Sequence, residues 1–163
     1  MAELALLVKS YHGDFEYAER LVQSINAHNV DALPVYIVVP EKDLQQFNVF
    51  ASDTTKILSE NLFSNHLVHE ETAGFRPGYI NQEIIKLAFW ELDVCENYFC
   101  VDSDAEFIRD FDRTDFMAQP GIPFTFLTED RELVVEPDYY QSTWVNRMKS
   151  LEKIRESIGY TGP

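Results

Sequence analysis

The chain has 163 residues, of which 45% are hydrophobic, and this fits one compact domain with a real core. Its formal charge of −15 comes with no cluster of Lys and Arg, which excludes a nucleic-acid partner and attraction to an anionic membrane surface. No apolar run approaches the length of a transmembrane segment, and the two cysteines suit a reducing compartment, so we expect a cytoplasmic protein.

The first forty residues predict a β-α-β unit. Residues 4–8 form a continuous apolar run that is typical of a strand buried on both faces. Apolar positions recur with helical spacing over residues 15–28, and residues 34–39 predict a second strand that ends at Pro40. Such a unit is the building block of a parallel sheet covered by helices.

The middle of the chain is less regular. Residues 41–50 predict a short helix, residues 65–69 a short third strand, and residues 70–78 an irregular loop. Residues 79–92 predict the clearest helix, and residues 98–101 a strand that leads into Asp102-Ser103-Asp104. The pattern further predicts the following elements: strands at residues 107–111, 123–127 and 133–135, and a last helix over residues 139–158.

Two polar segments follow predicted parallel strands. One is the loop of residues 9–14 after the first strand, and the other is Asp102-Ser103-Asp104. Ligands of open α/β sheets bind at the carboxyl ends of the strands, where both segments should meet. Paired aspartates there suit a hard divalent cation that bridges to phosphates, and a solvated acidic turn is the alternative.

The order of these features resembles a known enzyme class. The stretch GYINQEIIKLAFWEL, followed by a strand and DSD, resembles glycosyltransferases of the GT-A fold, including glycogenin-like enzymes. The opening LLVKSYHGDFEYAERLVQSINAHN with PVYIVVPEKDLQQF is similar to a bacterial family of little-characterised glycosyltransferases. The resemblance covers roughly residues 4–111.

The resemblance implies a fold and an activity. The fold is α/β, a Rossmann-like three-layer sandwich of the GT-A type with a mainly parallel central sheet, complete or truncated. The activity is transfer of a sugar from a nucleotide diphosphate donor, most simply a UDP-sugar, to an acceptor that is a sugar, a lipid or a protein. We expect residues 1–163 to form one domain, the N-terminal donor-binding part of a longer chain, because the stretch after Asp104 is short and contains no histidine.

The resemblance also assigns site residues. Asp102 and Asp104 would hold Mn²⁺ or Mg²⁺ on the donor diphosphate, and no catalytic residue is assigned. The donor itself would contact the following residues: Ser10, Tyr11, Asp14, Arg76, Gln82, Lys86, Asp102 and Ser103. Each has a structural alternative, such as a solvated Lys86, a packed Tyr11, a surface Arg76 or an Asp14 that caps the next helix.

Other readings of the sequence stay open. His66, His69 and the acidic pair after them suggest a second metal site, or else structural and exposed histidines. The whole chain could be a non-catalytic nucleotide-binding, metal-binding or interaction domain. A haloacid-dehalogenase-type phosphatase with Asp102 as nucleophile is a further alternative.

Overall fold

The computed structural model describes residues 2–71, 75–124, 138 and 149. The chain divides into two compact units, Met1–Phe124 and Thr125–Pro163, and the fold below is that of the first. The strand predicted over residues 133–135, most of the strand predicted over 123–127 and most of the helix predicted over 139–158 lie outside the described residues. The prediction of a single domain over the whole chain stays a prediction.

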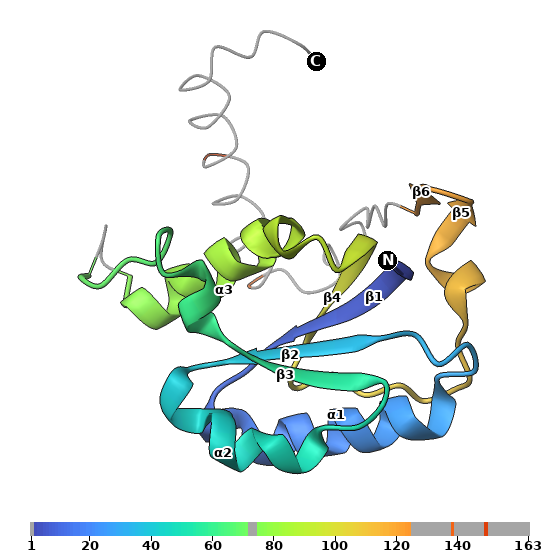
Figure 1. Ribbon diagram of the computed structural model, residues 1–163, viewed down its shortest axis with the longest axis horizontal. Coiled ribbons are helices and arrows are strands. Elements are labelled where there is room, and N and C mark those ends of the chain that lie inside the picture. The colour runs from blue at the N-terminus through green and yellow to red at the C-terminus, as the bar shows by residue number, and fades with distance from the viewer. Residues whose placement is uncertain (1, 72–74, 125–137, 139–148, 150–163) are drawn as a thin grey trace, which may run out of the picture. The chain divides into compact units, whose positions relative to one another are not determined.

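A parallel sheet forms the centre of this unit (Figure 1). Within the described residues its four strands are β1 (Ala2–Lys9), β2 (Val35–Val39), β3 (Thr55–Ser59) and β4 (Cys95–Asp102), in the order β3-β2-β1-β4. All three pairings are parallel. The α/β class and the parallel sheet predicted from the sequence are therefore confirmed.

Helices cover both faces of the sheet, which gives three layers of the Rossmann-like kind (Figure 1). Helices α1 (Phe15–His28) and α2 (Leu44–Phe47) lie on one face, and α3 (Pro77–Ala88) lies on the other. Shorter elements connect these layers: 3₁₀ turns at His12–Asp14, Glu41–Asp43, Asn48–Phe50, Glu60–Phe63, Phe89–Leu92 and Arg113–Asp115, and a small antiparallel pair, β5 (Met117–Gln119) with β6 (Ile122–Pro123).

The alternation of side chains along β1 explains why the sheet needs both layers. Leu6 and Val8 join the core cluster that includes residues of α1, whereas Ala5 and Leu7 join the cluster that includes Ile85 of α3. All four of these β1 residues are fully buried. Burial on both faces is what the continuous apolar run of the sequence predicts.

The third strand lies where the sequence did not predict it. Residues 65–69 form no strand, and β3 is Thr55–Ser59 instead. The side chain of Asn81 accounts for the difference, because its Oδ1 accepts from the Val68 N–H at 2.8 Å and its Nδ2 donates to the Val68 carbonyl at 2.9 Å. These bonds satisfy the backbone that a neighbouring strand would otherwise satisfy.

The strand predicted at residues 107–111 is also wrong. The backbone there is irregular, and only Phe111 makes an isolated bridge, to Asn29. The aromatic residues that suggested a strand pack on each other instead, with the rings of Phe107 and Phe111 stacked at 4.0 Å between centroids. None of the helices in the described ranges is long and apolar enough to span a membrane.

Candidate functional site

The carboxyl edge of the sheet brings the two predicted polar segments together. Lys9, the last residue of β1, is in register with Asp102, the last residue of β4, and the two strands are neighbours. The strand order also reverses direction between β1 and β4, since β2 and β3 follow β1 on its other side. Such a switch point is where open α/β sheets bind ligands.

A hydrogen bond joins the loop after β1 to the turn after β4. The hydroxyl of Ser103, which is buried, donates to the Asp14 carboxylate at 3.4 Å. Asp14 occupies the N-cap position of α1 but makes no capping hydrogen bond with its side chain. Its carboxylate is therefore directed to the turn of Asp102 and Asp104 rather than to the helix that follows it.

Lys86 supplies a positive charge beside the two aspartates. Its Nζ lies 2.9 Å from Asp102 Oδ1 and 3.4 Å from Glu83 Oε1. Burial lowers the pKa of Lys86, but the hydrogen bond and the charge of Asp102, helped by Glu83, outweigh burial, so the pKa is raised overall. Lys86, for which the resemblance implies a place at the site and for which solvation is the alternative, thus contacts Asp102.

Asp104 follows Asp102 by two residues in the same turn. It is exposed, and no described side chain pairs with it. The described part of the chain gathers no group of three or more His, Cys, Asp or Glu side chains around a common point. Mg²⁺ and Mn²⁺ need no such cage, because they commonly take one or two carboxylates and complete their shell with phosphates and water. Asp102 and Asp104 fit that mode of binding.

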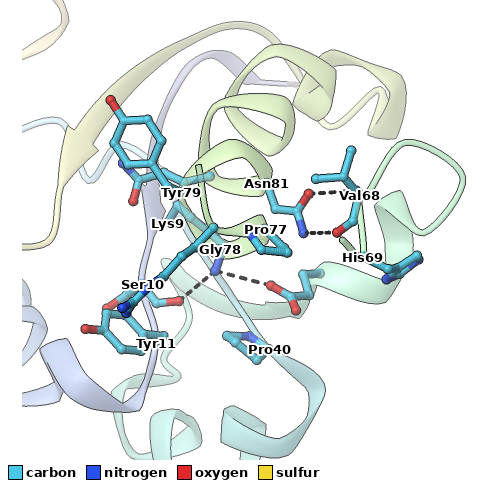
Figure 2. A pocket seen from close by; sticks show the side chains of 13 residues that line it. Lys9, Ser10, Tyr11, Pro40, Val68, His69, Pro77, Gly78, Tyr79 and Asn81 are labelled. Atoms are coloured by element: carbon cyan, nitrogen blue, oxygen red, sulfur yellow. Dashed lines mark hydrogen bonds and ion pairs between the residues drawn. The ribbon is translucent and has the colours of Figure 1, made fainter. Parts of the chain in front are cut away.

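A cavity of about 660 Å³ opens at the carboxyl ends of β1, β2 and β3 (Figure 2). Its walls come from the ends of β1, β2 and β3 and from the beginning of α3, and they are formed by Lys9, Ser10, Tyr11, Pro40, Glu60, Val68, His69, Arg76, Pro77, Gly78, Tyr79, Asn81 and Gln82. Four of the predicted donor-binding residues therefore line one cavity: Ser10, Tyr11, Arg76 and Gln82. The other four, Asp14, Lys86, Asp102 and Ser103, do not line it.

Helix α3 connects the cavity with the aspartates. Gln82 lines the cavity and Lys86, four residues later, holds Asp102. Residues four apart lie on the same helix face at about 5–6 Å between their Cβ atoms. Through Gln82 and Lys86, the same face of α3 therefore borders the cavity and contacts Asp102.

Lys9 is the most deeply placed cation of the cavity. Its side chain is only 8% exposed, and its Nζ lies 2.9 Å from the Ser10 carbonyl and 3.3 Å from Glu60 Oε2. Figure 2 shows these two interactions as dashed lines from the ammonium group. Burial lowers the pKa of Lys9, against the raising effect of the Glu60, Asp43 and Asp14 carboxylates.

Buried contacts fix the loop that carries Ser10 and Tyr11. Asp43, 5% exposed, accepts from the His12 N–H at 2.9 Å and lies 3.2 Å from His12 Nδ1. The Tyr11 ring covers Gly13 so closely that a Cβ there would lie 2.5 Å from a ring carbon. Gly13 is therefore required for the position of Tyr11.

Sequence reasoning missed Lys9, Glu60 and Tyr79 as lining residues. The position of Lys9 could have indicated a buried cation, since a lysine ends an otherwise apolar strand. From the sequence alone, Lys9 is placed only in the polar loop of residues 9–14. Glu60 follows β3, a strand that the sequence did not reveal. The two histidines of the suggested second metal site have different surroundings. His66 Nε2 contacts Glu91 at 2.9 Å, whereas His69 lines the cavity.

A model for a family of unknown function, DUF6492, matches residues 3–153, which is most of the chain. No curated protein matches the chain.

Proposed function

The chain belongs to DUF6492, a family of unknown function, and we propose that it is a glycosyltransferase, or the donor-binding part of one, that takes a nucleotide diphosphate sugar. One observation carries the proposal. A cavity and the exposed carboxylate of Asp104 lie at the same edge of a parallel sheet, and helix α3 lines the cavity with Gln82 and contacts Asp102 through Lys86. The cavity can take the nucleoside while the diphosphate reaches the aspartates.

The residues divide the work of binding. Tyr11 and Tyr79 offer aromatic surface to a base or ribose, and Ser10 offers a hydroxyl. Asp104 would be the principal ligand of Mn²⁺ or Mg²⁺. Asp102 would assist from a position fixed by Lys86, and Ser103 holds the turn to Asp14.

The expected chemistry is electrostatic. A divalent cation held at Asp104 would supply charge that stabilises the departing nucleoside diphosphate. Lys86, whose raised pKa keeps it protonated at neutral pH, adds a fixed positive charge on the same side. The chain's own task is to place the donor and hold these charges in position before reaction. The acceptor is a sugar, a lipid or a protein, as the resemblance implies.

A thermal-shift titration tests the proposal. The wild-type chain is heated with UDP-, GDP- and CDP-sugars, each with and without Mn²⁺. At a ligand concentration of about 100 times Kd, binding adds about 2.7 kcal/mol to the free energy of unfolding, which raises the Tm by several degrees. We expect such a rise for at least one donor, and only with the metal.

Two variants make the result specific. Asp104→Ala should lose the metal-dependent shift and keep the Tm of the free protein, because Asp104 is exposed and unpaired among the described residues. Glu106→Ala, an exposed acidic residue of the same loop, should keep the shift. No shift with any donor would overturn the proposal. A shift without release of nucleoside diphosphate over long incubation would favour the non-catalytic binding domain.

A further inference from the structure

The cavity collects positive charge in a strongly acidic protein. The chain carries a formal charge of −15, yet the lining contains Lys9 and Arg76 against a single carboxylate, Glu60. His69 adds a further charge when protonated. An anion approaching this protein is repelled by most of the surface, so a local excess of cations is what it would need in order to bind.

The inner wall has hydrogen-bonding capacity that the protein does not use. The Ser10 hydroxyl oxygen is buried, in a residue only 2% exposed, and it has no hydrogen-bond partner among the described residues. Leaving a buried polar group without a partner costs about 1–3 kcal/mol. The Lys9 ammonium has three N–H donors and contacts two acceptors, Glu60 and the Ser10 carbonyl, which leaves one donor over.

The first turn of α3 adds to the same cavity. The helix has 12 residues, begins with Pro77 at N1, and has no side-chain cap at its N-cap residue, Arg76. Its N-terminus therefore carries uncompensated positive partial charge, which favours anions. The Arg76 side chain has no ion-pair partner within residues 2–71 and 75–124.

We propose that this cavity is a metal-independent subsite for the acidic group, a phosphate or a carboxylate, of a flat organic anion. Lys9, Arg76 and the N-terminus of α3 receive the acidic group, and the Ser10 hydroxyl, whose oxygen lies buried in the wall, donates to it after the side chain rotates. The remainder of the ligand lies against the apolar and aromatic part of the lining, which consists of Tyr11, Pro40, Val68, Pro77 and Tyr79.

The subsite does not depend on the proposed transferase activity, since it requires neither the metal nor Asp104. If both proposals hold, the acidic group is the donor phosphate next to the nucleoside, the other phosphate is held by the metal at Asp104, and the cavity contributes affinity that the metal does not supply. The two proposals can fail separately, because one predicts binding in the presence of a chelator and the other predicts binding that a chelator abolishes.

The test is a calorimetric titration in EDTA with matched charged and neutral probes. Phenyl phosphate and benzoate are compared with phenol, and uridine 5′-monophosphate is compared with uridine. We expect each anion that binds to do so at least about tenfold more tightly than its neutral counterpart, which is the effect of one to two charge-assisted hydrogen bonds. Binding of either the phosphate or the carboxylate supports the subsite, and the tighter of the two identifies its preferred acidic group.

Charge-removing variants locate the binding. Arg76→Gln should weaken anion binding about tenfold without loss of folding, since Arg76 is exposed. Lys9→Met should weaken anion binding at least as much. If that variant does not fold, Arg76→Gln alone tests whether the anion binds in this cavity. Arg20→Gln, an exposed arginine of α1 outside the cavity, and Asp104→Ala should both bind the anions as the wild type does.

Ser10→Ala gives a readout that a structural role would not produce. Removing a buried hydroxyl without a partner should leave the Tm of the free protein unchanged or raise it by a degree or more. The same change should weaken anion binding several-fold. A Tm that falls together with affinity would instead mean that Ser10 supports the fold.

Three results would overturn the subsite. The first is equal affinity for charged and neutral probes, and the second is anion binding that Arg76→Gln leaves unchanged. The third is binding that appears only with Mn²⁺ and disappears in Asp104→Ala, a result that would leave the transferase proposal intact while removing the subsite.

Discussion

Two lysines at one edge of the sheet have pKa values that their environments shift in opposite directions. Burial lowers the pKa of Lys9 although carboxylates surround it, whereas the direct contact with Asp102 raises the pKa of Lys86 in spite of burial. Lys86 therefore serves as a permanent counter-charge. Lys9 is a desolvated donor whose charged form gains from an incoming anion.

The Lys86–Asp102 ion pair has a predictable effect on stability. Because the pKa of Lys86 is raised in the folded state, its contribution is complete below its ordinary value of 10.5 and is lost as the pH rises through the higher folded value. The Asp102 side chain is 67% exposed, so solvent screening limits the coupling to about 0.5 kcal/mol.

A double-mutant cycle measures that coupling. Urea unfolding of the wild type, Lys86→Met, Asp102→Asn and the double variant at about pH 8 should give this value, and the same cycle at about pH 11 should give a smaller one. A coupling that stays constant between the two pH values would contradict the assignment of the charge to Lys86.

At the scale of residues, the sequence predicted the polar site in part. The motif around Asp102 and Asp104 could be recognised because its residues are consecutive and follow a strand. The Lys9–Glu60 contact could not, because it joins the ends of two strands that are adjacent to β2 on opposite sides. A short sequence pattern does not indicate which strand ends lie next to each other in the folded sheet.

At the scale of elements, periodicity decided which predictions were right. Helix α1 begins and ends at the predicted residues, since its apolar positions repeat with helical spacing and pack on the sheet. Strand β3, with the sequence TKILS, lies at the sheet edge and has a polar half, so its pattern is weak. In α3 Leu87 is 75% exposed, while Ile85 and Ala88 are buried.

The loop between β1 and α1 depends on one buried carboxylate. Asp43→Ala should remove both contacts to His12 and leave the His12 N–H without its acceptor, which costs about 1–3 kcal/mol. Because the loop carries Tyr11, ligand binding in the cavity should weaken as well. Urea unfolding and the titrations in EDTA measure the two effects.

Asp43→Asn is the matched control. Its amide oxygen can still accept from the His12 N–H, so it should restore a large part of the stability and of the binding that Asp43→Ala loses. Equal losses in both variants would mean that the charge of Asp43, rather than its hydrogen bond, holds the loop.

At the scale of the whole molecule, the net charge of −15 implies internal repulsion. Raising NaCl from about 0.02 M to about 0.5 M shortens the Debye length from roughly 20 Å to roughly 4 Å, which screens this repulsion and should raise the Tm by a few degrees. Sorbitol at matched osmolality, which does not screen charge, separates this effect from general crowding. An unchanged or lower Tm in NaCl would show that attractive ion pairs outweigh the repulsion.

The pairing of β1 with β4 has a consequence for how the protein reaches its native state. Ala2 pairs with Cys95, so the first strand to be synthesised cannot complete its hydrogen bonding until the ribosome has passed the last strand of the sheet. Contacts between such distant parts of a chain form slowly. During that interval one edge of a mostly apolar strand stays open to other chains, which is a known route to aggregation. The same pairing brings Lys9 beside Asp102, so the turn that carries Asp104 is positioned only when β1 and β4 have paired.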